Sequence, residues 1–180
     1  DMLEQAEKRL NGQAHIRCVQ GDVGNLPMAD ESFDIVVSMN GFHAFPDKQK
    51  AFAETWRVLK PGGKVIVVYN FREEKAACTK ALADLRHKFN PEFHGFSNGM
   101  SNEKCKAFFA GKCEIFRTDN TQIYDRQGYI NRVLSSSYSL REEDDNYAEY
   151  LREIEKIFDL FSKGGRITVA TETVAYIGEV

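Results

Sequence analysis

The chain has 180 residues, of which 42% are hydrophobic and 28% are charged, and its formal net charge is −3. These values are ordinary for one soluble globular domain that is long enough to bury a core. The acidic balance disfavours nucleic acid as a partner, because backbone binding needs clustered lysines and arginines. The sequence shows no apolar run of bilayer length and no signal-peptide pattern, so no membrane partner is predicted.

The cysteines and histidines predict neither a disulfide framework nor a metal site. The four cysteines are Cys18, Cys78, Cys105 and Cys113. They form no C-x-x-C pair, which favours reduced thiols in a cytoplasmic protein. The histidines are scattered without the spacing of metal ligands.

The first part of the chain predicts two helices and three strands. Residues 2–10 are good helix formers with apolar side chains on one face, and His15 to Gln20 predicts a short strand. Phe33 to Met39 predicts the next strand. A helix follows from Asp47, its N-cap, to Leu59, and Lys64 to Tyr69 predicts a third strand.

The second part predicts four helices and two strands. The helices cover Glu73 to Phe89, Ser101 to Ala110, Asp125 to Leu134 and Asn146 to Ser162, and the strands cover Cys113 to Tyr124 and Arg166 to Ile177. Apolar residues from Tyr147 to Phe161 form one stripe along the last helix. The sequence leaves open whether this stripe packs inside the protein or against a second copy in a homodimer.

The chain is organised around the stretch from Gly21 to Tyr69. Two uncharged β-branched runs, Ile35-Val36-Val37 and Val65 to Val68, bracket a helix that ends at Pro61-Gly62-Gly63. Runs that are apolar at every position predict strands covered on both faces, as in a parallel sheet. A helix between two such strands predicts a right-handed βαβ unit, and the glycines predict a tight turn with positive φ between helix and strand.

Four motifs follow one another in this stretch. They are Gly21-Asp22-Val23, Leu26-Pro27-Met28, Phe33 to Val36, and Glu54 to Gly63 with the pattern E-x-x-R-V-L-K-P-G-G. In this order and spacing they resemble the middle of the class I methyltransferases that use S-adenosylmethionine, over roughly Met2 to Tyr69. The resemblance implies an α/β fold, a Rossmann-like three-layer sandwich whose mostly parallel sheet ends in a C-terminal antiparallel hairpin.

The resemblance also assigns the parts of a single domain, residues 1–180. Residues 1–70 would bind the cofactor, 71–112 and 125–163 would be helical segments on the substrate side, and 113–124 and 166–177 would be the hairpin strands. The family's first strand, its glycine-rich loop and the acid that ends its second strand have no counterpart here. The resemblance therefore implies that an N-terminal βαβ piece is absent, with Asp1 too late to be that acid.

The cofactor residues implied by the resemblance follow two predicted strands. The Asp22 carboxylate would accept a hydrogen bond from the adenine amino group, and the Val23 backbone N–H would donate to the ring. A turn after a strand is the alternative role for Asp22. Ser38, Met39 and Asn40 lie where the family meets the methionine and adenosine parts of the cofactor, and core packing is the alternative for Met39.

Four residues are candidates for the acceptor side. His43 occupies a loop position that lies near the reactive methyl in some family members, and it could act as general base toward a hydroxyl acceptor; a structural hydrogen bond is the alternative. Phe42 and Phe71 could line an apolar pocket, although most such aromatics belong to the core. Tyr138 could present a hydroxyl to the substrate, or form a turn between helices.

The leading hypothesis is an enzyme, an S-adenosylmethionine-dependent methyltransferase acting on a small-molecule acceptor by in-line displacement. Such a reaction depends on positioning and needs neither a protein nucleophile nor a metal. The alternative is a non-catalytic binding or interaction module with a degenerate cofactor site. A Rossmann-type dehydrogenase would need a glycine fingerprint and a parallel sixth strand, which this sequence does not show.

Overall fold

The computed structural model describes residues 2–10, 12–41, 44–96, 102–109 and 112–179. The contacts divide the chain into two units, residues 1–65 with 179–180, and residues 66–178. Strand β2 (Leu59–Arg72) runs through both units. None of the helices in the described part of the chain is long and apolar enough to cross a membrane.

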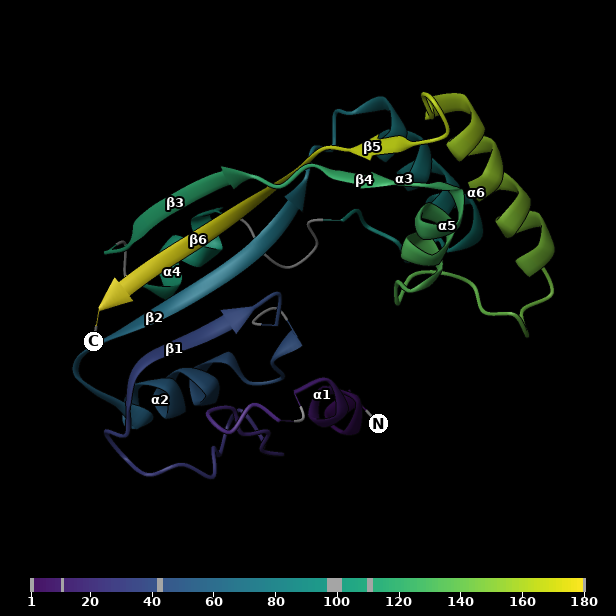
Figure 1. Ribbon diagram of the computed structural model, residues 1–180. Coiled ribbons are helices and arrows are strands. Elements are labelled where there is room, and N and C mark those ends of the chain that lie inside the picture. Colours follow the sequence, from purple (N-terminus) through teal and green to yellow (C-terminus); the bar gives the residue numbers. More distant parts are fainter. Residues whose placement is uncertain (1, 11, 42–43, 97–101, 110–111, 180) are drawn as a thin grey trace. The chain divides into compact units, whose positions relative to one another are not determined.

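The first unit is built from α1 (Met2–Leu10), β1 (Phe33–Met39), α2 (Lys48–Val58) and the start of β2. The predicted helices and the central strand are confirmed. Asp47 caps α2, since its Oδ1 accepts a hydrogen bond from the Lys50 N–H at 3.0 Å. Strands β1 and β2 are hydrogen-bonded neighbours, and their arrows point the same way in Figure 1. They form a βαβ unit around α2.

Two predictions for this unit are wrong. His15 to Gln20 forms no strand, because no described strand lies beside it to complete a ladder and the Ile16 N–H bonds locally to the Gln13 carbonyl at 3.0 Å. Strand β2 begins at Leu59, directly after α2, instead of at Lys64. The two glycines therefore lie inside the strand. Gly62 has the predicted positive φ of 77°.

Strand β1 also departs from the prediction that both of its faces are covered. Its odd-numbered side chains are exposed by 38% at Phe33, 53% at Ile35, 54% at Val37 and 67% at Met39. No described element covers these side chains. β1 is the first strand in the sheet order β1-β2-β6-β3, so it has a hydrogen-bonded neighbour on one side only. An all-apolar run thus identifies a strand here without showing how many of its faces are buried.

The second unit carries four helices and four further strands. They are α3 (Ala77–Phe89), α4 (Asn102–Phe108), β3 (Glu114–Asp119), β4 (Gln122–Tyr124), α5 (Arg126–Leu134), α6 (Tyr147–Phe161), β5 (Ile167–Val169) and β6 (Thr171–Glu179). Strand β6 lies between β2 and β3 and pairs antiparallel with β3, with Glu114 opposite Ile177. The predicted C-terminal hairpin is confirmed.

Each predicted hairpin strand is divided in two by the structure. Strands β4 and β5 form a separate two-stranded sheet, with Gln122 opposite Val169. The break after β3 occurs where Asp119 Oδ1 accepts hydrogen bonds from the Thr121 backbone N–H at 2.9 Å and hydroxyl at 2.7 Å. Such an Asx turn competes with a continuous ladder. Ser101 and Ala110, the ends of one predicted helix, lie outside the described residues.

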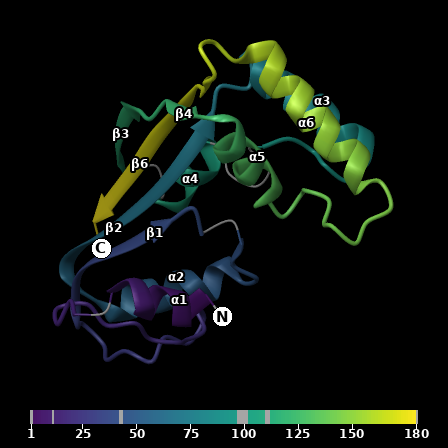
Figure 2. The same cartoon turned by 45° about the vertical axis from the view of Figure 1, so that its right-hand side comes forward.

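The core of the second unit lies where α3, α5 and α6 pack together, with α3 and α6 side by side in Figures 1 and 2. Its buried members are Leu82, Leu85, Tyr129, Ile130, Val133, Tyr150, Ile154, Ile157, Phe158 and Ile167. Four of them come from the apolar stripe of α6. The stripe therefore packs inside this unit, as expected for one face of an amphipathic helix.

Candidate functional site

In the first unit, one arginine ties two of the sequence motifs together. Arg57 and Glu54 form two hydrogen bonds of 2.8 Å, from Arg57 Nε to Glu54 Oε1 and from Arg57 Nη2 to Glu54 Oε2. The same guanidinium donates to the carbonyls of Leu26 at 3.0 Å and Met28 at 2.8 Å, and to Asp30 Oδ1 at 2.6 Å. The Leu-Pro-Met turn is thereby held against α2.

This arrangement lowers the pKa of the Glu54 carboxyl group. The hydrogen bonds from Arg57, and then the one from the Leu26 N–H at 2.7 Å, lower the pKa of Glu54 from 4.5 to about 2. The carboxylates of Glu54 and Asp30 raise the pKa of Arg57. Because the pKa of Glu54 is depressed in the folded state, its contribution to stability is complete above pH 4.5 and is lost as the pH falls toward 2.

We therefore expect Glu54→Gln to lower the melting temperature by several degrees at pH 7, because the charge facing Arg57 is removed and one fork of the guanidinium loses its acceptor. The difference from the unmodified protein should shrink as the pH approaches 2. Thermal denaturation followed by circular dichroism at several pH values measures this. Glu4→Gln, which removes an exposed ion pair of α1, is the control and should change little. A difference that does not vary with pH would contradict the assignment.

Asp22 lies in a turn. Its Oδ1 accepts from the Gly24 N–H at 2.7 Å, and its carbonyl accepts from the Asn25 N–H at 2.9 Å. The turn-forming role that the sequence allowed is thus present. The other carboxylate oxygen, Oδ2, has no hydrogen-bond partner within the described ranges, and the residue is exposed. Gly21 packs against the Pro27 ring, where a Cβ would lie 2.7 Å from Pro27 Cδ, so this close approach explains the glycine before Asp22.

The end of β1 carries the other cofactor candidates. Ser38 is half-buried, whereas the Met39 side chain is 67% exposed. Asn40 follows with a φ of +51°, a conformation that asparagine tolerates better than most residues. Such backbone at the carboxyl end of a strand is typical of ligand-binding positions. All five candidates, with Val23 in the half-buried turn after Asp22, belong to the first unit.

Of the four acceptor-side candidates, the structure describes two, Phe71 and Tyr138. Phe42 and His43 lie outside the described residues. The Phe71 ring lies 5.9 Å from the Tyr69 ring, centroid to centroid. The Tyr138 ring meets the buried Phe93 ring edge-on at 5.3 Å and is itself 37% exposed. No group of three or more histidine, cysteine or acidic side chains that could hold a metal occurs in the part of the chain that is described.

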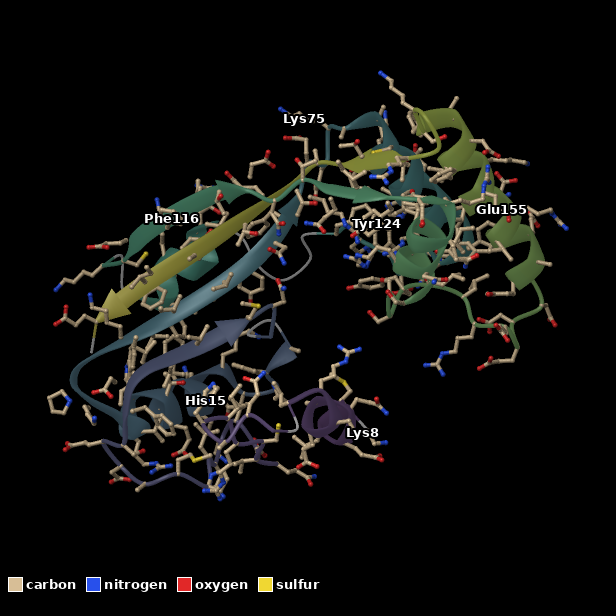
Figure 3. The ribbon with its side chains drawn as sticks, in the orientation of Figure 1. Lys8, His15, Lys75, Phe116, Tyr124 and Glu155 are labelled. Carbon is tan, nitrogen blue, oxygen red and sulfur yellow. The ribbon has the colours of Figure 1, made fainter. Side chains whose placement is uncertain are left out.

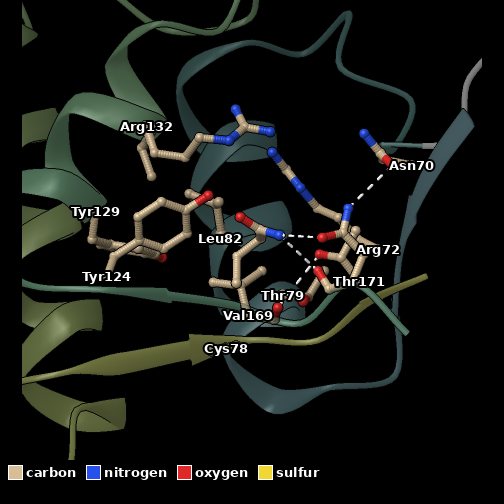
Figure 4. A pocket seen from close by; sticks show the side chains of 13 residues that line it. Asn70, Arg72, Cys78, Thr79, Leu82, Tyr124, Tyr129, Arg132, Val169 and Thr171 are labelled. Atoms are coloured by element: carbon tan, nitrogen blue, oxygen red, sulfur yellow. Dashed lines mark hydrogen bonds between the residues drawn. The ribbon is translucent and has the colours of Figure 1, made fainter. Parts of the chain in front are cut away.

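Sequence reasoning missed a pocket in the second unit, shown in Figure 4. Its volume is about 190 Å³, and it opens between the end of β2, the first turns of α3, the β4–β5 sheet and α5. Arg72 and Arg132 point into it, with their guanidinium groups turned toward one another. The sequence signal was an arginine at the end of β2, four positions after the apolar run Val65 to Val68.

One wall of this pocket is aromatic. Tyr124 projects from β4 toward the start of α5, where a Cβ on Gly128 would lie 3.6 Å from the Tyr124 ring (Figure 3). Tyr129 of α5 is 3% exposed, and burial is the main cause that raises the pKa of its phenol. The Tyr129 hydroxyl therefore stays neutral at physiological pH.

The amide side chains at the pocket edge are bonded to one another. Asn120 Nδ2 donates to Thr173 Oγ1 at 2.9 Å, and Gln122 Nε2 donates to the Asn120 carbonyl at 2.9 Å. The Thr173 hydroxyl donates in turn to Asn70 Oδ1 at 2.6 Å. These bonds connect β2, β3 and β6 at the point where the four-stranded sheet ends and the β4–β5 sheet begins.

Comparison with known proteins identifies the first unit. Residues 1–67 match the family model described as a methyltransferase domain. The demethylmenaquinone methyltransferase of Lactobacillus johnsonii is 45% identical over 67 residues, which are 36% of this chain and 28% of that protein. The demethylmenaquinone methyltransferase of Staphylococcus aureus is 30% identical over 137 residues, which are 73% of this chain and 54% of that protein. The chain spans about half the length, or less, of these curated relatives.

The fold has solved counterparts. One is the crystal structure of a Bacillus halodurans protein assigned as a methyltransferase, with a TM-score of 0.58 and 19% sequence identity. The aligned region covers 99% of this chain and 78% of the Bacillus chain. At that identity the likeness shows the fold alone. The family match and the four ordered motifs identify residues 1–67 as part of a class I S-adenosylmethionine-dependent methyltransferase, and the solved counterpart shows the Rossmann-like α/β fold of such proteins.

Proposed function

We propose that this protein transfers the methyl group of S-adenosylmethionine to a small-molecule acceptor. The observation that carries the proposal is the family match over residues 1–67, whose motifs the Arg57 hydrogen bonds hold in one arrangement. Similar proteins are named for small acceptors, demethylmenaquinone in one case and arsenite in another. The alternative, a non-catalytic module with a degenerate cofactor site, would keep the same fold without turnover.

Five residues of the first unit are the candidates to hold the cofactor. S-adenosylmethionine, when bound, supplies an electrophilic methyl group on a positively charged sulfur. Asp22 keeps an open acceptor, Oδ2, for the adenine amino group, and the Val23 N–H would donate to the ring. Ser38, Met39 and Asn40 would contact the methionine and adenosine parts, with the exposed Met39 side chain providing apolar contact. Residues 1–70 would thus form the cofactor part.

The acceptor would be positioned by the helical segments 71–112 and 125–163, with Phe42, Phe71 and Tyr138 as contact residues. His43 would take the proton from an acceptor hydroxyl as that oxygen attacks the methyl carbon. The enzyme's main contribution would be to align the two reactants and exclude water, which in favourable cases lowers the barrier by about 7–11 kcal/mol. A homodimer and a cytoplasmic location also stay predictions.

The first test is calorimetric titration of S-adenosylhomocysteine, the reaction product, into this chain and into the full-length product of its gene. Micromolar binding by the full-length product, with little binding by this chain, would support a methyltransferase of whose cofactor site this chain holds only a part. Absence of binding by both would favour the non-catalytic module.

For His43→Ala in the full-length protein we expect turnover to fall by about 10²–10⁴-fold, the usual contribution of a general base. The affinity for S-adenosylhomocysteine should not change, because the base acts on the acceptor. Release of S-adenosylhomocysteine during turnover is the measurement, and His15→Ala is the control, since His15 is exposed outside any helix or strand. Unchanged turnover would remove His43 from the mechanism.

A further inference from the structure

Two arginine side chains, Arg72 and Arg132, line the pocket of the second unit, and a third, Arg86, lies behind it against the same Phe96 ring as Arg72. Arg72 comes from the end of β2, Arg86 from α3 and Arg132 from α5. The guanidinium carbons of Arg72 and Arg86 lie 4.3 and 5.1 Å from the centroid of the Phe96 ring. Arg86 is only 1% exposed, and its Nη2 donates to the Val133 carbonyl at 3.4 Å. The positive charge is therefore partly buried and held by aromatic contacts.

No carboxylate among the described residues balances this charge. Among the residues that the structure describes, none of the three guanidinium groups forms an ion pair, and no aspartate or glutamate lines the pocket. Burial, and then the charges of Arg132 and Arg86, lower the pKa of Arg72 to about 10. Arg72 is still charged at neutral pH. Uncompensated buried charge is costly, so an anion that enters the pocket would be strongly favoured.

Two buried donors at this pocket have no acceptor. Arg72 Nη1 and Thr79 Oγ1 are buried without a hydrogen-bond partner in the described part of the protein, and the Thr79 residue is only 3% exposed. Arg132 likewise makes no side-chain hydrogen bond there, and its guanidinium is turned toward that of Arg72 (Figure 4). Guanidinium groups can only donate hydrogen bonds. The guanidinium groups of Arg72 and Arg132 and the Thr79 hydroxyl could therefore donate together to an anionic oxygen of a ligand.

The remaining surface defines the rest of the ligand. Leu82, Tyr129, Val133 and Val169 contribute apolar lining to the same pocket. The volume of about 190 Å³ is below the roughly 300–1,000 Å³ of pockets that hold drug-sized ligands. The pocket thus combines positively charged donors with apolar lining in a small volume. A small ligand with an apolar body and one negatively charged group fits this combination better than a bare inorganic ion or a nucleotide.

We propose that the pocket binds the carboxylate of a small organic acid, with Arg72, Arg132 and Thr79 as its donors and the apolar lining against its body. The proposal that the acid binds rests only on the residues of the pocket. That the acid is the methyl acceptor, anchored by its carboxylate, rests on the function proposed above.

Phenylacetate is a suitable probe, since it joins a carboxylate to one aromatic ring. Isothermal titration of the chain without cofactor should give a dissociation constant of about 1 mM or tighter. Phenylacetamide, which has the same shape without the charge, should bind at least about tenfold more weakly. Inorganic phosphate in place of phenylacetate should also bind more weakly; phosphate binding tighter than phenylacetate would overturn the choice of carboxylate.

The matched variants are Arg72→Met and Arg132→Gln, with Arg152→Gln as control. Both pocket variants should weaken phenylacetate binding at least about tenfold, whereas Arg152, exposed on α6, should have no effect. Arg132 is on the surface, so its variant tests the site without risk to folding. Equal affinity in Arg132→Gln and the unmodified protein, or equal affinity for acid and amide, would overturn the proposal.

The two proposals fail independently. If phenylacetate binds but no methyl transfer or S-adenosylhomocysteine binding is found, the pocket stands and the enzyme function falls. If S-adenosylhomocysteine binds and turnover is detected while no carboxylate binds, the anion site falls and the methyltransferase remains.

Discussion

The Asp22→Asn variant of the full-length protein is expected to bind S-adenosylhomocysteine about 10- to 100-fold more weakly than the unmodified protein, as is usual when a hydrogen bond to a charged group is lost. Asparagine keeps an Oδ1 that can accept from the Gly24 N–H, so the turn should survive. It replaces Oδ2 by an NH₂ group, which cannot accept a hydrogen bond from the adenine amino group. The change therefore separates the turn from the cofactor contact.

Calorimetric titration measures the affinity, and the melting temperature of the variant reports whether the turn is intact. Asp22→Ala should cause a similar loss of affinity but a lower melting temperature, since it also removes the hydrogen bond to Gly24. Affinity that is unchanged in Asp22→Asn would mean that Asp22 serves the turn alone.

Ile154→Ala should lower the free energy of unfolding of the second unit by about 2–5 kcal/mol, the usual cost of truncating a fully buried isoleucine. Ile154 is 0% exposed and lies in the cluster formed by α3, α5 and α6. Ile154→Val, which removes one methylene, should cost about 0.5–1.5 kcal/mol. The graded pair distinguishes a packing loss from a general disturbance of the helix.

Urea denaturation followed by circular dichroism measures these differences, and Leu160→Ala is the control on the same helix, because Leu160 is 74% exposed. Leu82, Tyr129 and Val133 belong to both the core cluster and the pocket wall. Ile154→Ala should therefore also weaken phenylacetate binding. Equal stability of the Ile154 and Leu160 variants would show that α6 does not pack as described.

Local patterns predicted the elements whose cause is local. The N-cap at Asp47, the helices of residues 2–10 and 126–134, and the stripe of α6 depend on side chains a few positions apart, and the structure confirms them. The ordered motifs also indicated the family. The cofactor candidates on residues 22–40 remain predictions. A sequence motif identifies such residues but does not show how far their atoms lie from a bound ligand.

Only the tertiary structure decided the features that join distant parts of the chain. The predicted strand at His15–Gln20 fails because a strand needs a neighbour, and β1 keeps one face exposed because coverage depends on what packs against it. Arg57 reaches carbonyls about thirty positions away, at Leu26 and Met28. The pocket brings Arg72, Thr79 and Arg132 together from three elements, and their lack of acceptors follows from burial, which sequence periodicity does not encode.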